Sequence, residues 1–507
     1  MKRALISVWD KSGLEELARF LYDHDFSITS TGGTAREIEG WGIPVTKVEE
    51  ITGQPAIMDG RVKTTDLRIF GPILADRDKS AHVQDLEHLG QQPIDLVVVN
   101  LYPFPEMLRR GASREELVEY IDIGGPSLLR AAAKNFRHVV VLCRPEQYAD
   151  FQQLYEEYGD DIPLDQRQAL AAKVYQHTAA YDGVIGEYFS PTLESPPASI
   201  NVRAELHQPL RYGENPHQRA GFYLGPGQAP PWKQLHGKEL SFNNYADLET
   251  ANRIVSGFDQ PAAVIVKHAN PCGFGVGETP EQAYRRALST DPVSSFGAIV
   301  GLNRPVNEAT AEALAGIFLE CVIAPAFAPE ALARLTRKKN LRLLEIVNGQ
   351  PAVPGREIRT VASGYLVQDA DSFQGEADWE VMTGRKPSPD EMQAMRLGWK
   401  LVRFVKSNAI VFTSFEQLLG VGAGQMSRVD AVIIAGMKAA QANLELGGAV
   451  MASDAFFPFP DGLEEAARLG ISAVIQPGGS IRDEEVVTAA DKHDIAMIFT
   501  HTRHFRH

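Results

Sequence analysis

Lys267 and His268 are residues whose types and position could support chemistry. They begin the segment KHANPCG, which follows the apolar run 261–266, a pattern typical of a short buried strand. The asparagine, proline and glycine of the segment favour a turn. Because ligands bind at the carboxyl ends of strands in an open α/β sheet, the lysine and the histidine form a candidate reaction site. A surface turn with a solvated lysine would show the same pattern.

A second candidate site opens a helix near the N-terminus. After the extended stretch 26–31, Gly32, Gly33 and Thr34 begin a helical segment. Free N–H groups at the start of a helix attract an anion, and glycines let the backbone approach it. Lys11, in the neighbouring loop, is available to the same anion. The motif STGGT therefore fits a phosphate site, although a Gly-Gly-Thr turn by itself is usually only a turn.

Further polar residues follow strands in the same part of the chain. Arg61 and Lys63 are two apart in GRVKT, so in an extended segment both side chains project to the same side. Asp122 precedes a glycine pair and a helix that carries Lys134. We expect these groups to lie at one edge of a sheet.

Strands and helices alternate in the N-terminal part, which predicts an α/β fold with a doubly wound parallel sheet. The expected strands are 4–8, 26–31, 94–99 and 139–142. At 507 residues the chain exceeds what one core usually holds. Residues 188–202 contain several prolines and serines without helical or strand period, as in a linker. We therefore predict two domains, 1–198 and 199–507.

Two glycine-rich or aromatic stretches of the second domain carry less information. GVGAGQMSR departs from the dinucleotide-binding pattern because Gln425 stands where its last glycine belongs, so nicotinamide binding is not expected. In SDAFFPF, residues 453–459, aromatic side chains beside an aspartate suit a flat heterocycle. A hydrophobic cluster in a loop would explain that stretch equally well.

The composition excludes several classes of protein. Lysine and arginine number 50 and aspartate and glutamate 65, and the net charge of −15 argues against binding nucleic acid or an anionic membrane non-specifically. No apolar run approaches the roughly 18 residues of a membrane span, and the first residues enter an α/β pattern instead of a signal peptide. Three scattered cysteines indicate a reducing compartment, so we expect a cytoplasmic protein. The histidines of the terminal HTRHFRH have no helical face to converge them, and no catalytic metal is expected.

Short motifs along nearly the whole chain, from Ser7 to Phe505, resemble one family, the bifunctional purine-biosynthesis enzymes that combine AICAR transformylase with IMP cyclohydrolase. The motifs are SVWDKSG, STGGTA, GRVKT, NLYPF, IDIGG, RAAAKN, RYGENPHQ, KHANPCG, SSFG, KSNAIV, GAGQMSR, DAFFPF and RHF. The resemblance implies a methylglyoxal synthase-like N-terminal domain that closes formyl-AICAR to IMP. It also implies two cytidine-deaminase-like subdomains that transfer a formyl group from 10-formyltetrahydrofolate to AICAR, and a homodimer whose transformylase sites draw on both subunits. Whether a structural potassium ion is bound stays open.

For formyl transfer, the resemblance implies Lys267, His268 and Asn408 as the reacting residues. The 5-amino group of AICAR is a weak nucleophile because its lone pair is delocalised, so it needs a base, a role that suits His268. Lys267 can stabilise the oxyanion or protonate the departing folate nitrogen, and Asn408 can donate a hydrogen bond. The implied nucleotide-binding residues are Arg211, Tyr212, Gly297, Glu320, Phe456 and Arg503. Those implied near the folate are Gln425, Arg428, Pro458 and Asp461.

For ring closure, the formyl oxygen needs a cation or an N–H donor, for which we choose Lys63. Asp122 can orient or deprotonate the attacking amide and Tyr102 can shuttle a proton, while Lys134 also matches a reaction-site position of the family. The remaining matching positions are Ser7, Lys11, Thr31, Gly32, Gly33, Thr34, Arg61, Thr64, Asn100, Gly124 and Gly125.

The chain departs from the family after GRVKT, where Thr65, Asp66 and Leu67 replace Leu-His-Pro and Phe70 replaces a histidine. Trp9 also replaces a small residue. Cyclohydrolase activity is still expected, and the alternative is that the N-terminal domain is a weak or non-catalytic nucleotide-binding module. A second alternative is a thiol acyltransferase with Cys272 as nucleophile and His268 as its base.

Overall fold

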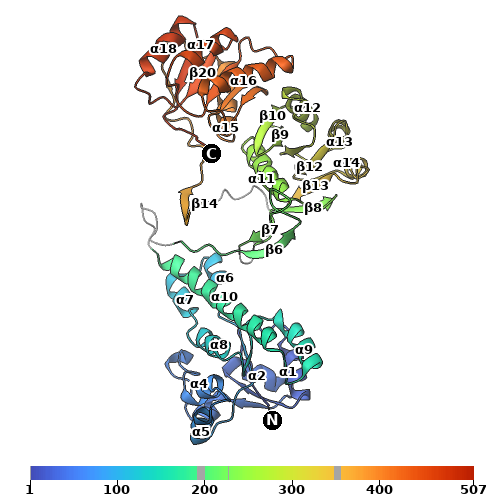
Figure 1. Cartoon of the computed structure of the whole chain (residues 1–507), viewed down its shortest axis with the longest axis vertical. Helices are drawn as coiled ribbons and strands as arrows, with labels where there is room; N and C mark the ends of the chain where they lie inside the picture. Colours follow the sequence, from blue (N-terminus) through green and yellow to red (C-terminus); the bar gives the residue numbers. More distant parts are fainter. Residues whose placement is uncertain (1, 191–199, 226–227, 348–354) are drawn as a thin grey trace. The chain divides into compact units, whose positions relative to one another are not determined.

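The chain forms two compact units in the computed structural model, Met1–Arg203 and Ala204–His507 (Figure 1). The structure describes residues 2–190, 200–225, 228–347 and 355–507. The predicted linker includes residues 191–199, and the predicted boundary at 198/199 likewise lies outside the described residues.

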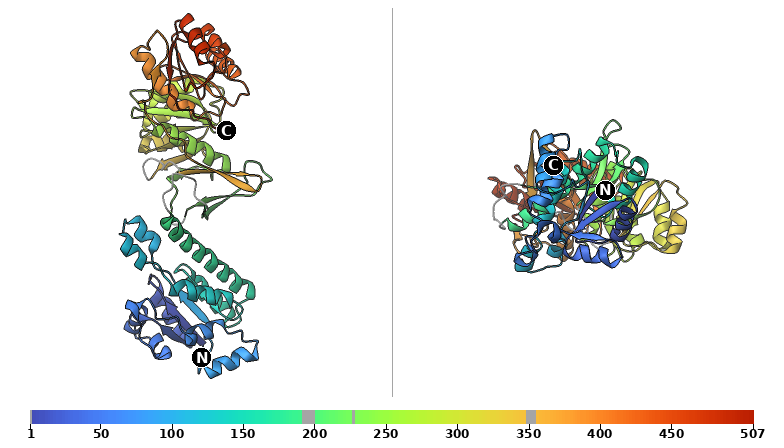
Figure 2. Two further views of the ribbon diagram at one scale, coloured as in Figure 1. Left: turned by 90° about the vertical axis from the view of Figure 1, so that its left-hand side faces the viewer. Right: turned by 90° about the horizontal axis from the view of Figure 1, so that it is seen from below.

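Unit 1 is built on a five-stranded parallel sheet, which confirms the predicted doubly wound arrangement. Its order is β3 (Val45–Lys47), β2 (Phe26–Ser30), β1 (Lys2–Ser7), β4 (Leu96–Val99) and β5 (Val140–Leu142). Successive residues of a strand pack in different hydrophobic cores. Leu5 of β1 and Val97 of β4 pack in one core, and their neighbours Ala4 and Val98 pack in the other. Helices therefore cover both faces of this sheet (Figure 2).

The helices of unit 1 connect successive strands and close its end. They are α1 (Leu14–Asp23), α2 (Gly32–Gly40), α3 (Val48–Thr52), the 3₁₀ turn η1 (Met58–Gly60), α4 (Leu67–Leu74), α5 (Ser80–His88), α6 (Phe104–Arg109), α7 (Arg114–Glu119), α8 (Gly124–Lys134), α9 (Gln147–Tyr158) and α10 (Leu164–Phe189). Two of them, α2 and α8, begin at the carboxyl edge of the sheet, at the glycines of the motifs STGGT and IDIGG.

Unit 2 contains two six-stranded mixed sheets. The first has the order β10 (Asn270–Val276), β9 (Ala262–Lys267), β11 (Ala298–Leu302), β12 (Leu319–Ala324), β13 (Arg342–Ile346) and β8 (Trp232–His236). The second has the order β18 (Leu418–Gly422), β17 (Ile410–Thr413), β19 (Val450–Ser453), β20 (Ala473–Gln476), β21 (Ala496–Phe499) and β16 (Glu380–Val381). Read in these orders, the two sheets have the same sequence of strand pairings. The first two pairs of strands are antiparallel, the next two are parallel, and the last is antiparallel. Unit 2 is thus a pair of subdomains with one sheet pattern.

Helices and two hairpins complete unit 2. The helices are α11 (Phe242–Ser256), α12 (Pro280–Thr290), α13 (Glu308–Ala315), α14 (Pro329–Leu335), α15 (Pro389–Val402), α16 (Arg428–Gln441), α17 (Asp461–Arg468) and α18 (Asp483–Lys492). The hairpins are β6 (Glu205–Leu210) with β7 (Ala220–Leu224), and β14 (Arg356–Val361) with β15 (Gly364–Asp369). Among the described residues, no helix combines the length and the apolar character needed to cross a membrane.

The two subdomains share one hydrophobic core, to which β9 contributes Val264 and β17 contributes Val411. Their sheets also touch at one edge, where the backbone N–H of Val276 donates to the carbonyl of Glu416 at 2.8 Å. This edge brings β9 and β10 beside the hairpin of β17 and β18, and so sets the candidate residues of the two subdomains near each other.

The turn at KHANPCG differs from the expectation. Asn270 and Gly273, predicted as turn residues, belong to β10, which pairs antiparallel with β9. The turn itself is His268 and Ala269, with φ of 53° and 56°. Gly273 serves packing instead, because a Cβ there would lie 2.0 Å from a backbone oxygen of α12.

Candidate functional site

A cavity of about 810 Å³ lies at the carboxyl edge of the sheet of unit 1. The strands β1, β2 and β4 all end at it, as the placement of polar residues after strands predicted. Most of the predicted residues of this unit line it: Ser7, Lys11, Thr31, Gly33, Thr34, Arg61, Lys63, Thr64, Asn100, Tyr102, Asp122, Gly124 and Gly125.

One side of the cavity has the character of an anion site. The N-terminus of α2 faces it, and the hydroxyl groups of Ser7 and Thr31 lie 3.0 Å apart beside it. The Thr34 hydroxyl donates to the carbonyl of Val8 at 3.0 Å and so joins the start of α2 to the end of β1. Gly32 has a φ of 45°, which favours glycine at that position.

Asn100 fixes the loop after β1, which borders the anion side of the cavity. Its Oδ1 accepts the backbone N–H groups of Trp9 and Asp10 at 2.6 and 3.0 Å, and its Nδ2 donates to the carbonyl of Asp10 at 2.7 Å. The side chain therefore positions the loop that carries Lys11.

Asp122 forms the opposite side of the cavity. Its Oδ1 accepts the N–H of Gly125 at 2.8 Å. Burial raises the pKa of this carboxyl, while the N–H groups of Gly125 and Tyr102 and the charge of Lys63 oppose the rise. A Cβ at Gly125 would lie 2.4 Å from the carboxylate, so glycine is required for this close approach. A carboxylate of raised pKa beside an ammonium group can serve as a general base.

The rim of the cavity includes Glu119 and Tyr120, which the sequence did not single out. Arg61 forms an ion pair with Glu119, and Trp9 packs edge-on against Tyr102 and Tyr120, with ring centroids 5.2 and 5.8 Å apart. Trp9 and Tyr102 were singled out in the sequence, but nothing in it indicated that Tyr120 joins them in an aromatic cluster.

Lys134 is not brought into the cavity. It is exposed at the last residue of α8, whereas the first residues of the same helix line the cavity. An α-helix rises about 1.5 Å per residue, so the two ends of α8 lie about 15 Å apart.

The substituted residues after GRVKT start a helix. Asp66 is the N-cap of α4, and its carboxylate accepts the N–H of Arg68 at 2.8 Å. Phe70 packs against the core of unit 1. Thr64, which precedes the substitutions, is buried at the cavity.

In unit 2, β9 ends at Lys267 and the turn presents His268 to solvent. The Lys267 ammonium donates to the carbonyls of Ser294 and Phe296 at 3.1 and 2.8 Å. These are its hydrogen-bond partners in the described part of the chain, so a third donor remains for a ligand. Asp247, on α11, accepts the N–H of Ala269 at 2.6 Å. Burial raises the pKa of its carboxyl, and that N–H and the charge of His268 counteract the rise.

Asn408 is half-buried and belongs to a polar network around the buried Arg428 and Asp454. Its Oδ1 accepts Nη2 of Arg428 at 2.9 Å, and its Nδ2 donates to the carbonyls of Gln425 and Met426 at 2.9 and 3.1 Å. Arg428 also donates to Asp454 at 2.5 Å, and that fully buried carboxylate accepts the Ser407 hydroxyl at 2.5 Å. Asp454 is the aspartate of SDAFFPF. It is therefore a partner for arginine inside the protein, and not an anchor at a ligand surface.

Removing the guanidinium from this network is expected to destabilise unit 2. Arg428→Met leaves a buried carboxylate without its cation, which typically costs about 3 to 5 kcal/mol. The midpoint of urea unfolding of unit 2 measures the loss. The control is Arg468→Met, which removes an exposed ion pair with Glu465 and should cost under about 1 kcal/mol. Equal midpoints for the two variants would contradict the expectation.

The other predicted residues of unit 2 lie on loops and strand ends of both subdomains. Arg211 lies over the ring of Tyr212 at 5.5 Å, and Glu320 pairs with Arg342 at 2.7 Å. Gly297, with a φ of 72°, follows the carbonyl of Phe296 that holds Lys267. Three more predicted residues belong to the second subdomain: Phe456 is half-buried, Pro458 is exposed, and Asp461 begins α17.

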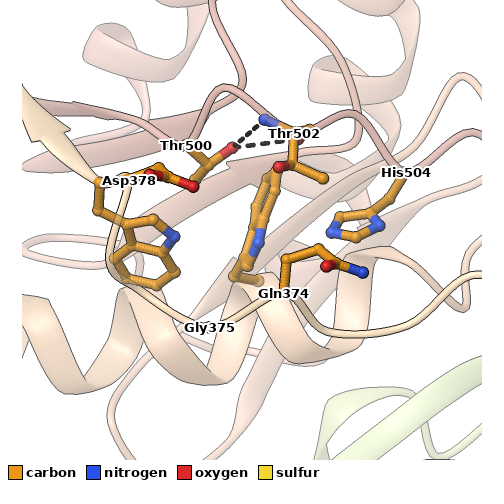
Figure 3. A pocket seen from close by; sticks show the side chains of 8 residues that line it. Gln374, Gly375, Asp378, Thr500, Thr502 and His504 are labelled. Atoms are coloured by element: carbon orange, nitrogen blue, oxygen red, sulfur yellow. Dashed lines mark hydrogen bonds between the residues drawn. The ribbon is translucent and has the colours of Figure 1, made fainter.

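The C-terminal tail is partly packed and partly solvated. His504 is buried, its Nδ1 lies 2.8 Å from Asp371, and its backbone N–H donates to the carbonyl of Asp454 at 3.0 Å. Figure 3 shows it with Thr500 and Thr502 at a small pocket. His501 and the predicted Arg503 are exposed.

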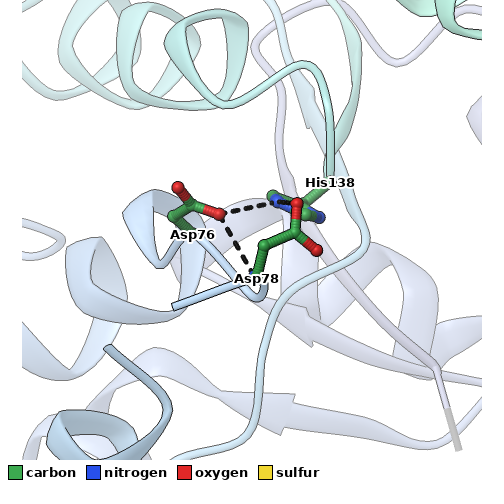
Figure 4. A group of neighbouring side chains, drawn as sticks. All are labelled: Asp76, Asp78 and His138. Atoms are coloured by element: carbon green, nitrogen blue, oxygen red, sulfur yellow. Dashed lines mark hydrogen bonds and ion pairs between the residues drawn. The ribbon is translucent and has the colours of Figure 1, made fainter. Parts of the chain in front are cut away.

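In the part of the chain that the structure describes, one group has ligand atoms as close as a metal site needs. Asp76, Asp78 and His138 lie within 4.8 Å of one another (Figure 4). Lys79 and Arg137 already pair with the two carboxylates, at 3.3 and 3.7 Å. His138 precedes β5, so the group lies at the amino edge of the sheet, opposite the cavity.

Comparison with known proteins relates the whole chain to one family. The family model described as AICARFT/IMPCHase bienzyme matches residues 132–438, and that of the MGS-like domain matches residues 13–127. Three curated relatives are each named bifunctional purine biosynthesis protein PurH. They come from Halalkalibacterium halodurans (49% identical), Oceanobacillus iheyensis (50%) and Persephonella marina (47%), and each alignment covers 100% of both chains.

Proposed function

Because the chain belongs to the AICARFT/IMPCHase bienzyme family, we propose that its two described sites divide the two reactions of that family between them. The protein is a formyltransferase and a cyclohydrolase, and it carries out the last two steps of IMP biosynthesis. We assign ring closure to the cavity of unit 1 and formyl transfer to the residues around the β9–β10 turn of unit 2. The observation that carries this assignment is the pairing, in one cavity, of an anion site with Asp122 and Lys63.

In ring closure, the start of α2 with Ser7 and Lys11 binds the nucleotide phosphate. The substrate then lies across the cavity toward Asp122, which takes a proton from the attacking carboxamide nitrogen. Lys63 donates to the formyl oxygen as negative charge develops there, and Tyr102 returns a proton before water leaves. Holding the two reacting groups together removes much of the barrier.

In formyl transfer, the nitrogen of the 5-amino group of AICAR attacks the formyl carbon, and His268 takes the proton that this nitrogen loses. The free donor of Lys267 stabilises the oxygen of the tetrahedral intermediate, and the Asn408 amide joins it by exchanging its bond to the carbonyl of Met426 for one to that oxygen. As the intermediate collapses, the bond between the formyl carbon and the folate nitrogen breaks, and the protonated His268 gives its proton to that nitrogen, so that tetrahydrofolate leaves. Arg428 holds the Asn408 amide in place from inside the protein.

A folate-derived molecule supplies the formyl group, and we assign 10-formyltetrahydrofolate to this role. Gln425, Arg428, Pro458 and Asp461 are the residues proposed near it.

We also propose a cytoplasmic homodimer. Exposed apolar side chains on the hairpin of β14 and β15, such as Tyr365 and Leu366, suit a contact with a second copy. The free state of all three cysteines suits a reducing compartment.

The thiol alternative makes a prediction that separates it from this proposal. Burial raises the pKa of the Cys272 thiol to about 12, and its Sγ donates to the carbonyl of Ile265 at 3.5 Å, so little thiolate exists at neutral pH. Cys272→Ala is expected to keep the rate of formyl transfer within about threefold of the parent. A rate that falls to background would instead favour a cysteine nucleophile.

The proposed function is tested on the full-length protein in two assays. AICAR with 10-formyltetrahydrofolate should yield tetrahydrofolate, and formyl-AICAR alone should yield IMP, read from its absorbance. Binding of formyl-AICAR without formation of IMP would show that unit 1 is a nucleotide-binding module and would contradict the assignment of its cavity.

A further inference from the structure

Asn270 joins the two parts of unit 2 that carry the proposed residues of formyl transfer. Its Nδ2 donates to the carbonyl of His268 at 2.9 Å. Its Oδ1 accepts the backbone N–H of Lys406, also at 2.9 Å. Lys406 precedes Asn408 by two residues, on the segment that leads into β17. One side chain thus connects the turn of the first subdomain to the catalytic segment of the second.

An amide is the side chain that this position requires. The carbonyl of His268 needs a donor and the N–H of Lys406 needs an acceptor, and an amide supplies both. The same two partners define the orientation of the Asn270 amide, because the reversed amide would place like groups against each other. Aspartate has the same size, but it would set a negative oxygen against the His268 carbonyl.

The turn that carries His268 depends on such contacts. His268 and Ala269 both adopt a positive φ, which non-glycine residues rarely do unless the surrounding structure holds them. Asp247 holds the turn from α11 through the N–H of Ala269. Asn270 holds it through the carbonyl of His268 and ties it to Lys406 of the second subdomain.

We propose that Asn270 is a positioning residue for formyl transfer, and that its amide keeps His268 in register with Asn408. The proposal rests on the roles given to those two residues above. The acceptor nitrogen of His268 serves the amine and the N–H donor of Asn408 serves the formyl oxygen of one reacting pair, so their separation decides the rate. A displacement of about 1 Å can lower a rate by about 100-fold.

Asn303 provides a matched control in the same sheet. Its Oδ1 accepts the N–H of Ala262 at 2.8 Å, and its Nδ2 donates to the carbonyls of Phe258 and Gln260 at 2.7 and 2.8 Å. The amide therefore braces the start of β9 by the same chemistry that Asn270 provides at its end. It touches neither the turn nor the segment of Asn408.

The test compares Asn270→Asp, Asn270→Ala and Asn303→Asp in the full-length protein. For each variant, kcat and KM of formyl transfer, the Kd for AICAR, thermal unfolding and the ring-closure rate are measured. We expect both Asn270 variants to lose about 10- to 100-fold in kcat, with KM and the AICAR Kd changed less than about threefold. Asn303→Asp should lower the unfolding temperature with little change in kcat per folded molecule.

Two results would overturn the proposal: a kcat of the Asn270 variants within twofold of the parent, or a fall in kcat that only follows the loss of folded, AICAR-binding protein, as in Asn303→Asp. A His268→Ala variant assayed in parallel separates this failure from that of the proposed site. If His268→Ala kept the parent rate, the assignment of the reacting residues itself would be wrong.

Discussion

Replacing His268 with alanine is expected to lower the kcat of formyl transfer by about 10²- to 10⁴-fold, the usual contribution of a positioned general base. The amine of AICAR has no other proposed group to receive its proton, because Lys267 is a donor to the carbonyls of Ser294 and Phe296. Steady-state assays with AICAR and 10-formyltetrahydrofolate measure the loss. Ring closure of formyl-AICAR by the same variant should be unchanged, since the proposed site for it lies in unit 1.

The control for this variant is His501→Ala. His501 is also exposed and also has a positive φ, of 56°, so the substitution has a similar effect on the backbone. It pairs with Glu380 at 3.4 Å and is not among the residues proposed for either reaction. Equal losses in the two variants would assign the effect to the backbone and would contradict the role of His268 as a base.

Replacing Lys63 with methionine is expected to slow ring closure by about 10²- to 10³-fold, the usual cost of removing one donor to a developing oxyanion. The same change should shift the pH profile. The Lys63 ammonium lowers the pKa of Asp122, so its removal raises that pKa further above the ordinary value. The carboxylate form then appears only at higher pH, and the acid limb of kcat/KM should move toward higher pH.

Lys11→Met is the matched control for this prediction. Lys11 lines the same cavity, on the side of the α2 N-terminus, where it is proposed to hold the phosphate. It should raise KM for formyl-AICAR and leave the acid limb in place. If the two lysine variants shifted the acid limb equally, the ammonium beside Asp122 would not be the one that sets its pKa. If neither moved it, Asp122 would not be the base.

The sequence motifs of unit 1 predicted that its polar residues gather at one edge of the sheet. Lys11 and Thr34 follow strands, and a parallel sheet brings such groups to one edge, so local order in the sequence was enough to place them together. Asp122 reaches the same cavity from the loop between α7 and α8. Lys134 shows the limit of this reasoning. Lys134 lies on the helix that begins at the IDIGG motif of Asp122, but it is at the far end of that helix and so lies away from the sheet edge.

In unit 2 the sequence misplaced two residues that lie beside the proposed reacting groups. Asn270 was expected in a turn and Asp454 at a ligand surface. The first lies in a strand and crosses to the second subdomain, and the second is a buried partner of Arg428. Neither role has a local signal, because each depends on a partner far along the chain.

By itself, the sequence determined the alternation of strands and helices, the parallel sheet of unit 1, and the polar segments at the edge of that sheet, since apolar period, turn residues and motif order are local properties. The tertiary structure alone decided that the turn at His268 and the segment of Asn408 meet. Asn270 and Lys406 are 136 residues apart in the chain, and they are joined because two sheets of one pattern pack edge to edge over a shared core. Contacts of that kind depend on how complementary surfaces pack, and no short stretch of sequence contains both surfaces.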